Sequence, residues 1–179
     1  MPIGYFVPEF PSQTHAFFWR EIEAMEADGE DVTLYSSRRP AAGACPHHFA
    51  DAARARTRYV FPPHKGAGLL ASRPARLKAA LGYVMGLSET SAAGRARLLP
   101  LIASAADLAA DCRERGIRHV HIHSFANSAH IGALAHILDG LSYSLTLHGD
   151  LPVYGTDHAA KAARAAFCVG VTAPLLEQI

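Results

Sequence analysis

Three polar residues that could bind a sugar or a phosphate follow a short apolar run late in the chain. His148, Gly149 and Asp150 come directly after Leu147. An imidazole there can donate a hydrogen bond to a ligand oxygen, and a glycine lets a ligand approach the backbone closely. Asp150 could accept a hydrogen bond from a hydroxyl group. The same residues are also typical of a plain turn, in which glycine and aspartate serve backbone geometry.

Three more histidines, His119, His121 and His123, alternate along an earlier apolar run. Residues two apart share a face of a β-strand, so three imidazoles in this pattern could in principle bind zinc. Metal sites usually draw ligands from several elements, however, so we expect hydrogen-bonded side chains here and no bound metal. His123 and Ser124, where the run ends, are candidates for substrate binding.

A loop near the amino terminus, PEFPSQT, offers a second polar group. Its backbone amides and the hydroxyls of Ser12 and Thr14 precede a helical pattern, and such a helix start can bind a phosphate or a sugar hydroxyl. Capping of that helix by Ser12 or Thr14 is the alternative, and it leaves Glu9 and Gln13 without a role. We therefore count all four residues among the substrate-binding candidates.

These candidates must be positioned by strands whose carboxyl ends meet. Residues 116–150 have the pattern of strand, helix and strand, which is the size and order of a βαβ unit. In an open parallel sheet the carboxyl ends of the strands border the ligand crevice. We therefore expect Ser12, His123 and His148 to lie along one edge of a sheet and to form one wall of a cleft.

The rest of the chain continues this alternation of strands and helices. Strands are predicted at 3–7 (ending at Pro8), 31–36, 58–61, 118–124, 143–147 and 167–171, and loops at 38–48 and 151–156. Helices are predicted at 15–28, 73–85, 124–138 and 158–166, and within 91–115, where the helix is interrupted or begins near Pro100. This order predicts an α/β fold, a doubly wound and mostly parallel sheet with helices on both faces, in a single domain over residues 1–179. The sequence lacks the GxGxxG, P-loop and GxSxG motifs of dinucleotide-binding, phosphate-binding and hydrolase sites.

Composition indicates a globular protein. Half of the 179 residues are hydrophobic, and no window of ~18 residues is apolar enough to span a bilayer. Three separate cysteines without a CxxC pair, and an amino terminus without a secretory signal pattern, favour a reducing cytoplasm. Charge is segregated, since residues 38–97 contain eleven Arg and Lys against only Asp51 and Glu89. Such a segment favours an anionic partner, and a solvated Arg-rich surface explains it equally well.

Three segments together resemble the amino-terminal domain of bacterial retaining glycosyltransferases of the GT-B fold, which is Rossmann-like. They are PEFPSQTHAFFWREIEAMEADGEDVTLYS, HVHIHSFANSAHIGALAHIL and YSLTLHGDLPVYGTDHAAKAARAAFCVGVT. The similarity covers residues 3–36 and 117–179 and is greatest to enzymes of exopolysaccharide assembly, including the colanic acid type. It implies a two-domain hexosyltransferase in which this half binds the acceptor. A carboxy-terminal domain outside this chain would bind the nucleotide-sugar, without a metal or a permanent cofactor.

The resemblance also implies roles for single residues. His148, which with Gly149 matches the family's His-Gly pair, would be the catalytic group and would hydrogen-bond a hydroxyl of the donor sugar. Tyr154 lies in the same segment and is counted among the substrate-binding candidates. The family often has Ser-Glu-Thr-Phe in the first loop, where this chain has Ser-Gln-Thr-His from Ser12 on, so that acidic side chain is missing. The carboxylates that grip the donor belong to the second domain, so this chain alone should be inactive.

Partners and alternatives follow from the same patterns. We expect a sugar acceptor, free or lipid-linked, and a location in the cytoplasm or on the inner face of the plasma membrane, where basic residues meet anionic lipids. Nucleic acid is not expected, because few aromatic residues lie among the basic ones. A sugar-nucleotide epimerase of the same fold and a non-catalytic glycan- or phosphate-binding module stay open. A helix-start pattern at 172–174, close to Ile179, leads us to expect that the natural protein continues.

Overall fold

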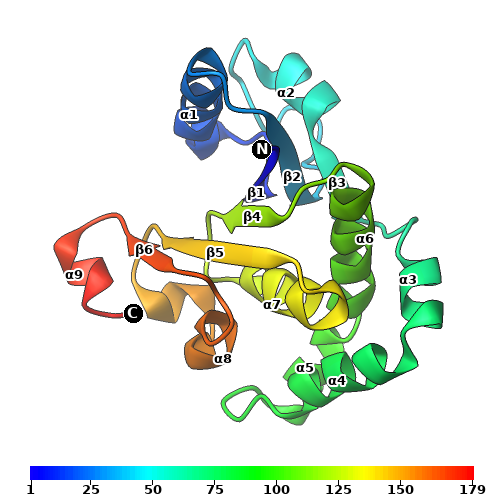
Figure 1. Cartoon of the computed structure of the whole chain (residues 1–179). Coiled ribbons are helices and arrows are strands. Elements are labelled where there is room, and N and C mark those ends of the chain that lie inside the picture. The colour runs from blue at the N-terminus through cyan, green and yellow to red at the C-terminus, as the bar shows by residue number, and fades with distance from the viewer.

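A computed structural model describes residues 1–179 and contains one six-stranded sheet in which all paired strands are parallel (Figure 1). The strands are β1 (Ile3–Glu9), β2 (Val32–Arg38), β3 (Arg58–Phe61), β4 (His119–Ile122), β5 (Ser142–Leu147) and β6 (Cys168–Gly170). Their order, β3-β2-β1-β4-β5-β6, is Rossmann-like, and the predicted doubly wound α/β fold is confirmed. The direction of winding reverses between β1 and β4, and ligand crevices of such sheets open at this point.

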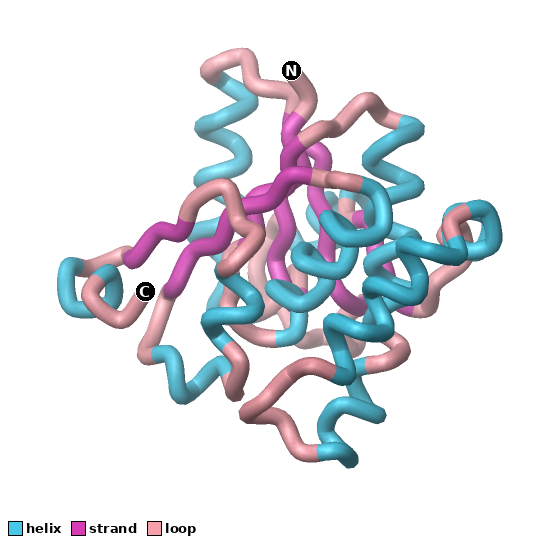
Figure 2. The backbone as a smooth tube through the Cα atoms, turned by 60° about the horizontal axis from the view of Figure 1, so that its bottom comes forward, coloured by secondary structure: helices cyan, strands magenta, loops and turns pink.

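Helices lie on both sides of the sheet, whose strands form one twisted layer (Figure 2). One face is covered by α1 (Ala16–Ala27) and α2 (Ala50–Arg56), and the other by α6 (Leu101–Glu114) and α7 (Asn127–Asp139). A further layer outside α6 and α7 consists of α3 (Ala67–Ser72), α4 (Pro74–Met85) and α5 (Ala92–Leu98). The last two helices, α8 (His158–Ala162) and α9 (Ala173–Leu176), pack against α7 and β6 respectively. None of these helices is both long and apolar enough to span a lipid bilayer.

The alternating side chains of β1 contribute to two separate cores. Tyr5 and Val7 belong to a cluster of 11 buried residues beneath α1 and α2, whereas Phe6 belongs to a cluster of 28 beneath α6 and α7. Burial on both faces is typical of a strand inside a parallel sheet. The smaller core contains no residue of β4 or β5, so these two strands present polar side chains on that face.

The first strand does not end at Pro8, as predicted, but continues to Glu9. The backbone carbonyl of Phe6 accepts a hydrogen bond from the amide of His123, so Pro8, two residues on, faces the same side. That position lies just past the end of β4. No neighbouring strand needs an amide donor there, which is why the strand tolerates a proline.

The helices between residues 50 and 100 differ most from the prediction. α2 and α3 occupy stretches without apolar periodicity, and each buries a single residue, so the sequence pattern does not predict them. The predicted interruption of the helical stretch 91–115 near Pro100 is confirmed, since α5 ends at Leu98 and α6 begins at Leu101. Proline has no amide hydrogen to continue a preceding helix, and it is well accommodated where a new helix begins.

Candidate functional site

Two of the predicted histidines meet at the carboxyl edge of the sheet. His123 follows β4 and His148 follows β5, and these strands are neighbours. Nδ1 of His123 lies 3.3 Å from Nε2 of His148, so one ring nitrogen donates a hydrogen bond to the other. These residues, called here the histidine pair, therefore converge as the strand pattern predicts.

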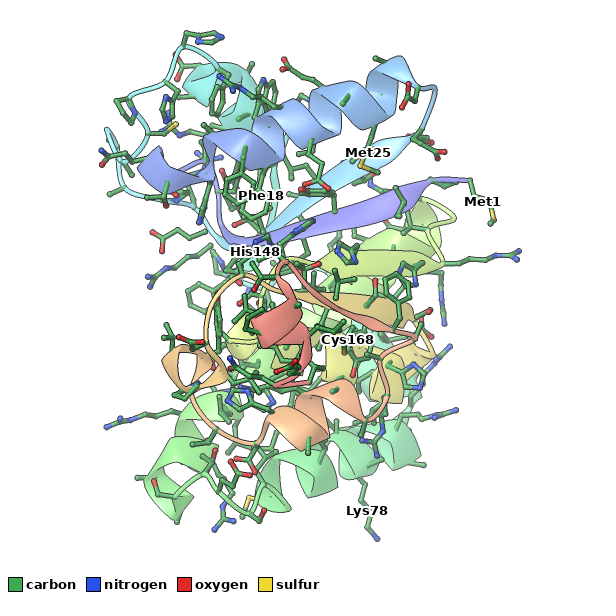
Figure 3. All side chains as sticks on the ribbon, turned by 90° about the vertical axis from the view of Figure 1, so that its left-hand side faces the viewer. Met1, Phe18, Met25, Lys78, His148 and Cys168 are labelled. Carbon is green, nitrogen blue, oxygen red and sulfur yellow. The ribbon has the colours of Figure 1, made fainter.

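The first turn of α1 places aromatic rings around the histidine pair (Figure 3). Phe18 packs edge-on against both imidazoles, with ring centroids 4.8 Å from His123 and 5.4 Å from His148. Tyr5 of β1 lies 4.2 Å from His123, and Phe17 lies 5.6 Å from His148. Phe17 is 47% exposed, so the surroundings of the pair include an aromatic ring that a ligand could reach.

Burial keeps both imidazoles neutral at physiological pH. His123 is 6% exposed, and this burial, reinforced by the nearby His121 and His148, lowers its pKa to about 2. Burial also lowers the pKa of the half-buried His148. A neutral imidazole has one donor and one acceptor nitrogen. Nε2 of His123 is buried without a hydrogen-bond partner, and such an atom destabilises the fold unless a ligand or water satisfies it.

The first loop lies at the same edge of the sheet, after β1. Ser12 precedes a 3-10 turn, Gln13–His15, that leads into α1, and its side chain does not cap this turn. The α-helix that follows also begins without a side-chain cap. The capping interpretation of Ser12 and Thr14 is therefore wrong, because backbone hydrogen bonds close this turn. Both hydroxyls remain available to a ligand, although no hydrogen bond joins either to the histidine pair.

Two histidines outside the pair hold the backbone of the first loop. Nδ1 of His15 donates to the carbonyl of Glu9, and Nε2 of His47 donates to the carbonyl of Gln13, both at 2.8 Å. The Glu9 carboxylate lies 3.4 Å from the guanidinium of Arg38 at the end of β2, and the Gln13 side chain is exposed. Glu9 is therefore directed toward β2.

Ser124 and Asp150, two other predicted residues, have partners within the fold. Ser124 is buried, and its Oγ accepts a hydrogen bond at 2.9 Å from the amide of Ala126, which closes the turn into α7. Asp150 is exposed, and its carboxylate accepts a hydrogen bond at 2.9 Å from the side chain of Gln178. Both side chains therefore have a structural role, Ser124 in the turn into α7 and Asp150 in a contact with the last residues of the chain.

Polar contacts of two buried residues, Lys161 and Asp157, fix the loop after Gly149, and the sequence pattern does not predict them. Lys161 is 2% exposed, its Nζ donates to the carbonyl of Tyr154 at 2.9 Å, and burial lowers its pKa to about 8. Asp157 accepts a hydrogen bond from the amide of Glu89 at 3.0 Å and returns one from its own amide to the Glu89 carboxylate at 2.9 Å. The Tyr154 hydroxyl in turn lies only 3.6 Å from where a Cβ atom on Gly149 would be.

His119 and His121 form no hydrogen bond to the histidine pair, although the His121 ring packs edge-on against His123 with ring centroids 4.6 Å apart. Both are hydrogen-bonded side chains, as predicted, and Phe167 stacks 6.0 Å from each ring. The ring nitrogens contact hydroxyls of β5, which makes a hydroxyl ladder: His119 with Ser142 at 2.9 Å and Ser144 at 2.8 Å, and His121 with Ser144 at 2.6 Å and Thr146 at 2.7 Å.

The histidine pair is best suited to an uncharged ligand that carries hydroxyl groups. Both imidazoles are neutral, and Glu21, whose charge acts on His148, already accepts a hydrogen bond from the Tyr5 hydroxyl at 2.7 Å. Neutral donors and acceptors beside aromatic rings match sugar hydroxyls better than phosphate oxygens. Comparison with known proteins gives no family for the chain, since no protein-family model and no curated protein matches it.

Proposed function

We propose that this chain is the acceptor-side half of a retaining GT-B glycosyltransferase of exopolysaccharide assembly. The observation that carries the proposal is the histidine pair, two neutral imidazoles in contact at the carboxyl edge of a parallel sheet. Doubly wound sheets bind ligands at this edge, beside the point where the winding reverses. The sequence resemblance supports the same assignment, because His148 and Gly149 match the family's His-Gly pair.

In this proposal His148 binds and orients a hydroxyl of the sugar that is transferred. His123 supports it, since the hydrogen bond between the two rings fixes which nitrogen of His148 faces the ligand. Their lowered pKa values make both rings weak bases, so their task is to position the sugar rather than to remove a proton. Ser12 and Thr14, whose hydroxyls have no partner in the fold, bind the acceptor.

Sugar transfer from a nucleotide-sugar by the complete gene product tests this proposal. We expect His148→Ala to lower kcat/KM by roughly tenfold or more, as for the loss of a positioned polar group. His48→Ala is the matched control, because His48 is an exposed loop histidine without a hydrogen bond, and it should leave transfer unchanged. Normal turnover in His148→Ala would remove this residue from the site.

Binding by the chain itself separates the proposal from its rivals. A free monosaccharide of the donor type should shift the ring resonances of His123 and His148 in NMR spectra, an acceptor glycan should shift the resonances of Ser12 and Thr14, and inorganic phosphate should shift neither set. Interconversion of a nucleotide-sugar without any acceptor would instead identify an epimerase. Glycan binding without transfer by the complete gene product would identify a binding module and would overturn the enzymatic proposal.

A further inference from the structure

Helices α3, α4 and α5 form the outer layer (Figure 1), and most of their exposed side chains are small or apolar. Most exposed residues between 67 and 98 are Ala, Gly, Ser, Leu, Met or Pro. Leu81 is 41% exposed and Met85 is 58% exposed, both on α4. Isolated exposed apolar residues are common, but a helix face that combines several of them indicates an interaction surface.

Helix α4 presents these residues on the side away from the core. Ala80 and Val84 are buried against the larger core, whereas Lys78, Leu81 and Met85 are exposed. Spacings of three, four and seven residues place these three on one stripe of a helix. Figure 3 shows Lys78 extending from the end of the molecule opposite α1, away from every other element.

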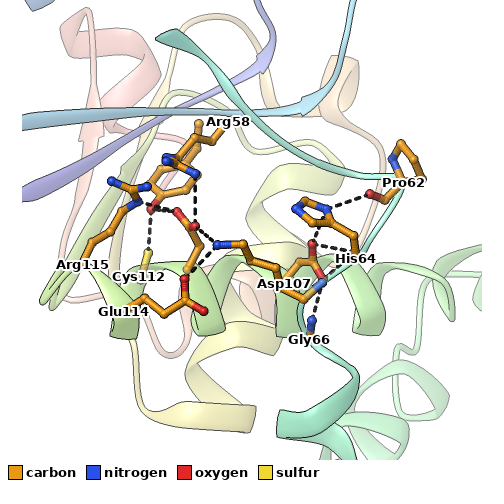
Figure 4. Close-up of polar contacts among 11 residues, drawn as sticks. Arg58, Pro62, His64, Gly66, Asp107, Cys112, Glu114 and Arg115 are labelled. Carbon is orange, nitrogen blue, oxygen red and sulfur yellow. Dashed lines mark hydrogen bonds and ion pairs between the residues drawn. The ribbon is translucent and has the colours of Figure 1, made fainter.

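Just over half of the cations in the basic segment 38–97 form ion pairs within the fold. Six of its eleven cations pair with acidic residues: Arg38 with Glu9, Arg54 with Asp51, Arg56 with Glu26, Arg58 with Asp111, Lys65 with Asp111 and Glu114, and Arg73 with Asp139. Figure 4 shows the centre of this network. Asp107 of α6 binds the backbone amides of His64, Lys65 and Gly66, so residues 58–66 are tied to α6.

The cations that remain are concentrated on the outer layer. Lys78 on α4 and Arg97 on α5 are exposed and have no acidic partner. Arg76 and Arg95 donate only to backbone carbonyls, so their charge is not cancelled. Glu89 is the one acidic residue between 67 and 98, and its carboxylate accepts a hydrogen bond from the backbone amide of Asp157. This surface is therefore both apolar and positively charged.

We propose that the outer face of α4, together with the exposed Arg97 of the adjoining helix α5, docks on an anionic lipid bilayer. Leu81 and Met85 enter the boundary between headgroups and acyl chains, and Lys78 and Arg97 contact lipid phosphates. A second copy of the chain is a poorer occupant, because it would bring two basic faces together. Nucleic acid is also poorer, since exposed Leu and Met gain nothing from a phosphate backbone. This inference does not depend on the histidine pair.

Vesicle flotation tests the inference with vesicles of phosphatidylcholine alone and vesicles that also contain phosphatidylglycerol. The chain should bind the anionic vesicles at low salt, more weakly as salt rises, and the neutral vesicles little. Lys78→Glu with Arg97→Glu should lower binding to anionic vesicles by roughly thirtyfold or more. Leu81→Ser with Met85→Ser should lower it by roughly tenfold, because the apolar contribution is lost.

A charge-matched variant keeps the inference falsifiable. Arg20→Glu with Arg118→Glu changes the net charge equally, at exposed arginines of α1 and of the turn before β4 that form no ion pair. This variant should bind anionic vesicles within about threefold of the original chain, because its charges lie off the α4 face. An equal loss in both charge variants would overturn the inference, as would failure of the original chain to bind. DNA binding lost in the Lys78 and Arg97 variant, without vesicle binding, would identify a nucleic-acid surface instead.

Discussion

Two kinds of histidine lie along one face of β4 and the residue that follows it. In the hydroxyl ladder, His119 and His121 each have both ring nitrogens bonded to hydroxyls of β5. His123 continues the same spacing, but β5 ends at Leu147, and His148 stands where the next hydroxyl of the ladder would be. One nitrogen of His123 is consequently left without a partner. The end of a strand, rather than the residue type, separates a structural histidine from one that is available to a ligand.

Acid should destabilise the fold strongly, because His121 of the ladder, His123 of the pair and the buried His130 of α7 are held neutral. Burial lowers the pKa of His121 to about 4, of His123 to about 2 and of His130 to about 4, from 6.5. Below pH 6.5 the unfolded chain binds protons that the folded chain excludes, so the free energy of unfolding falls as pH falls. Between pH 7 and pH 5 each histidine should account for a loss of roughly 2 kcal/mol, less for His121 because it keeps some solvent contact.

Urea unfolding at pH 7 and pH 5 measures this loss. In His121→Asn the difference in the free energy of unfolding between pH 7 and pH 5 should be smaller than in the original chain, by the contribution of that one histidine. An equally steep dependence in this variant would show that His121 does not take part. Stability that is the same at both pH values would contradict the neutral state of all three.

Removal of the shared hydroxyl of the ladder should have the next largest effect. Ser144 is fully buried and serves one nitrogen of His119 and one of His121. Ser144→Ala leaves both nitrogens unpaired and should lower the free energy of unfolding by roughly 2 to 3 kcal/mol. Ser142→Ala is the control, because Ser142 serves one nitrogen and is only partly buried, so its cost should be about 1 kcal/mol or less. Equal costs in the two variants would mean that the ladder does not act as a unit.

The sheet and its carboxyl edge could be predicted because they depend on local patterns. Apolar runs such as 143–147 mark the strands, and parallel strands bring their ends together, which places His123 beside His148. Contacts between distant residues leave no such pattern. The sequence around Lys161 gives no sign that this charge is buried, and Lys65 meets its partner Asp111 only through the packing of α6. From the sequence alone the basic segment is therefore predicted to be a charged surface, because its ion-pair partners on other elements are known only from the structure.

Two serines that follow neighbouring strands allow the smallest and most discriminating test. Ser124 after β4 accepts the amide of Ala126, so Ser124→Ala should lower the free energy of unfolding by about 1 kcal/mol. Ser12 after β1 caps nothing, so Ser12→Ala should change it by less than about 0.3 kcal/mol. If Ser12 binds the acceptor, its loss should raise the acceptor KM severalfold in the complete gene product and leave kcat nearly unchanged, because uniform binding is lost. A stability loss in Ser12→Ala as large as that in Ser124→Ala, with an unchanged KM, would instead make Ser12 a structural residue of the first loop.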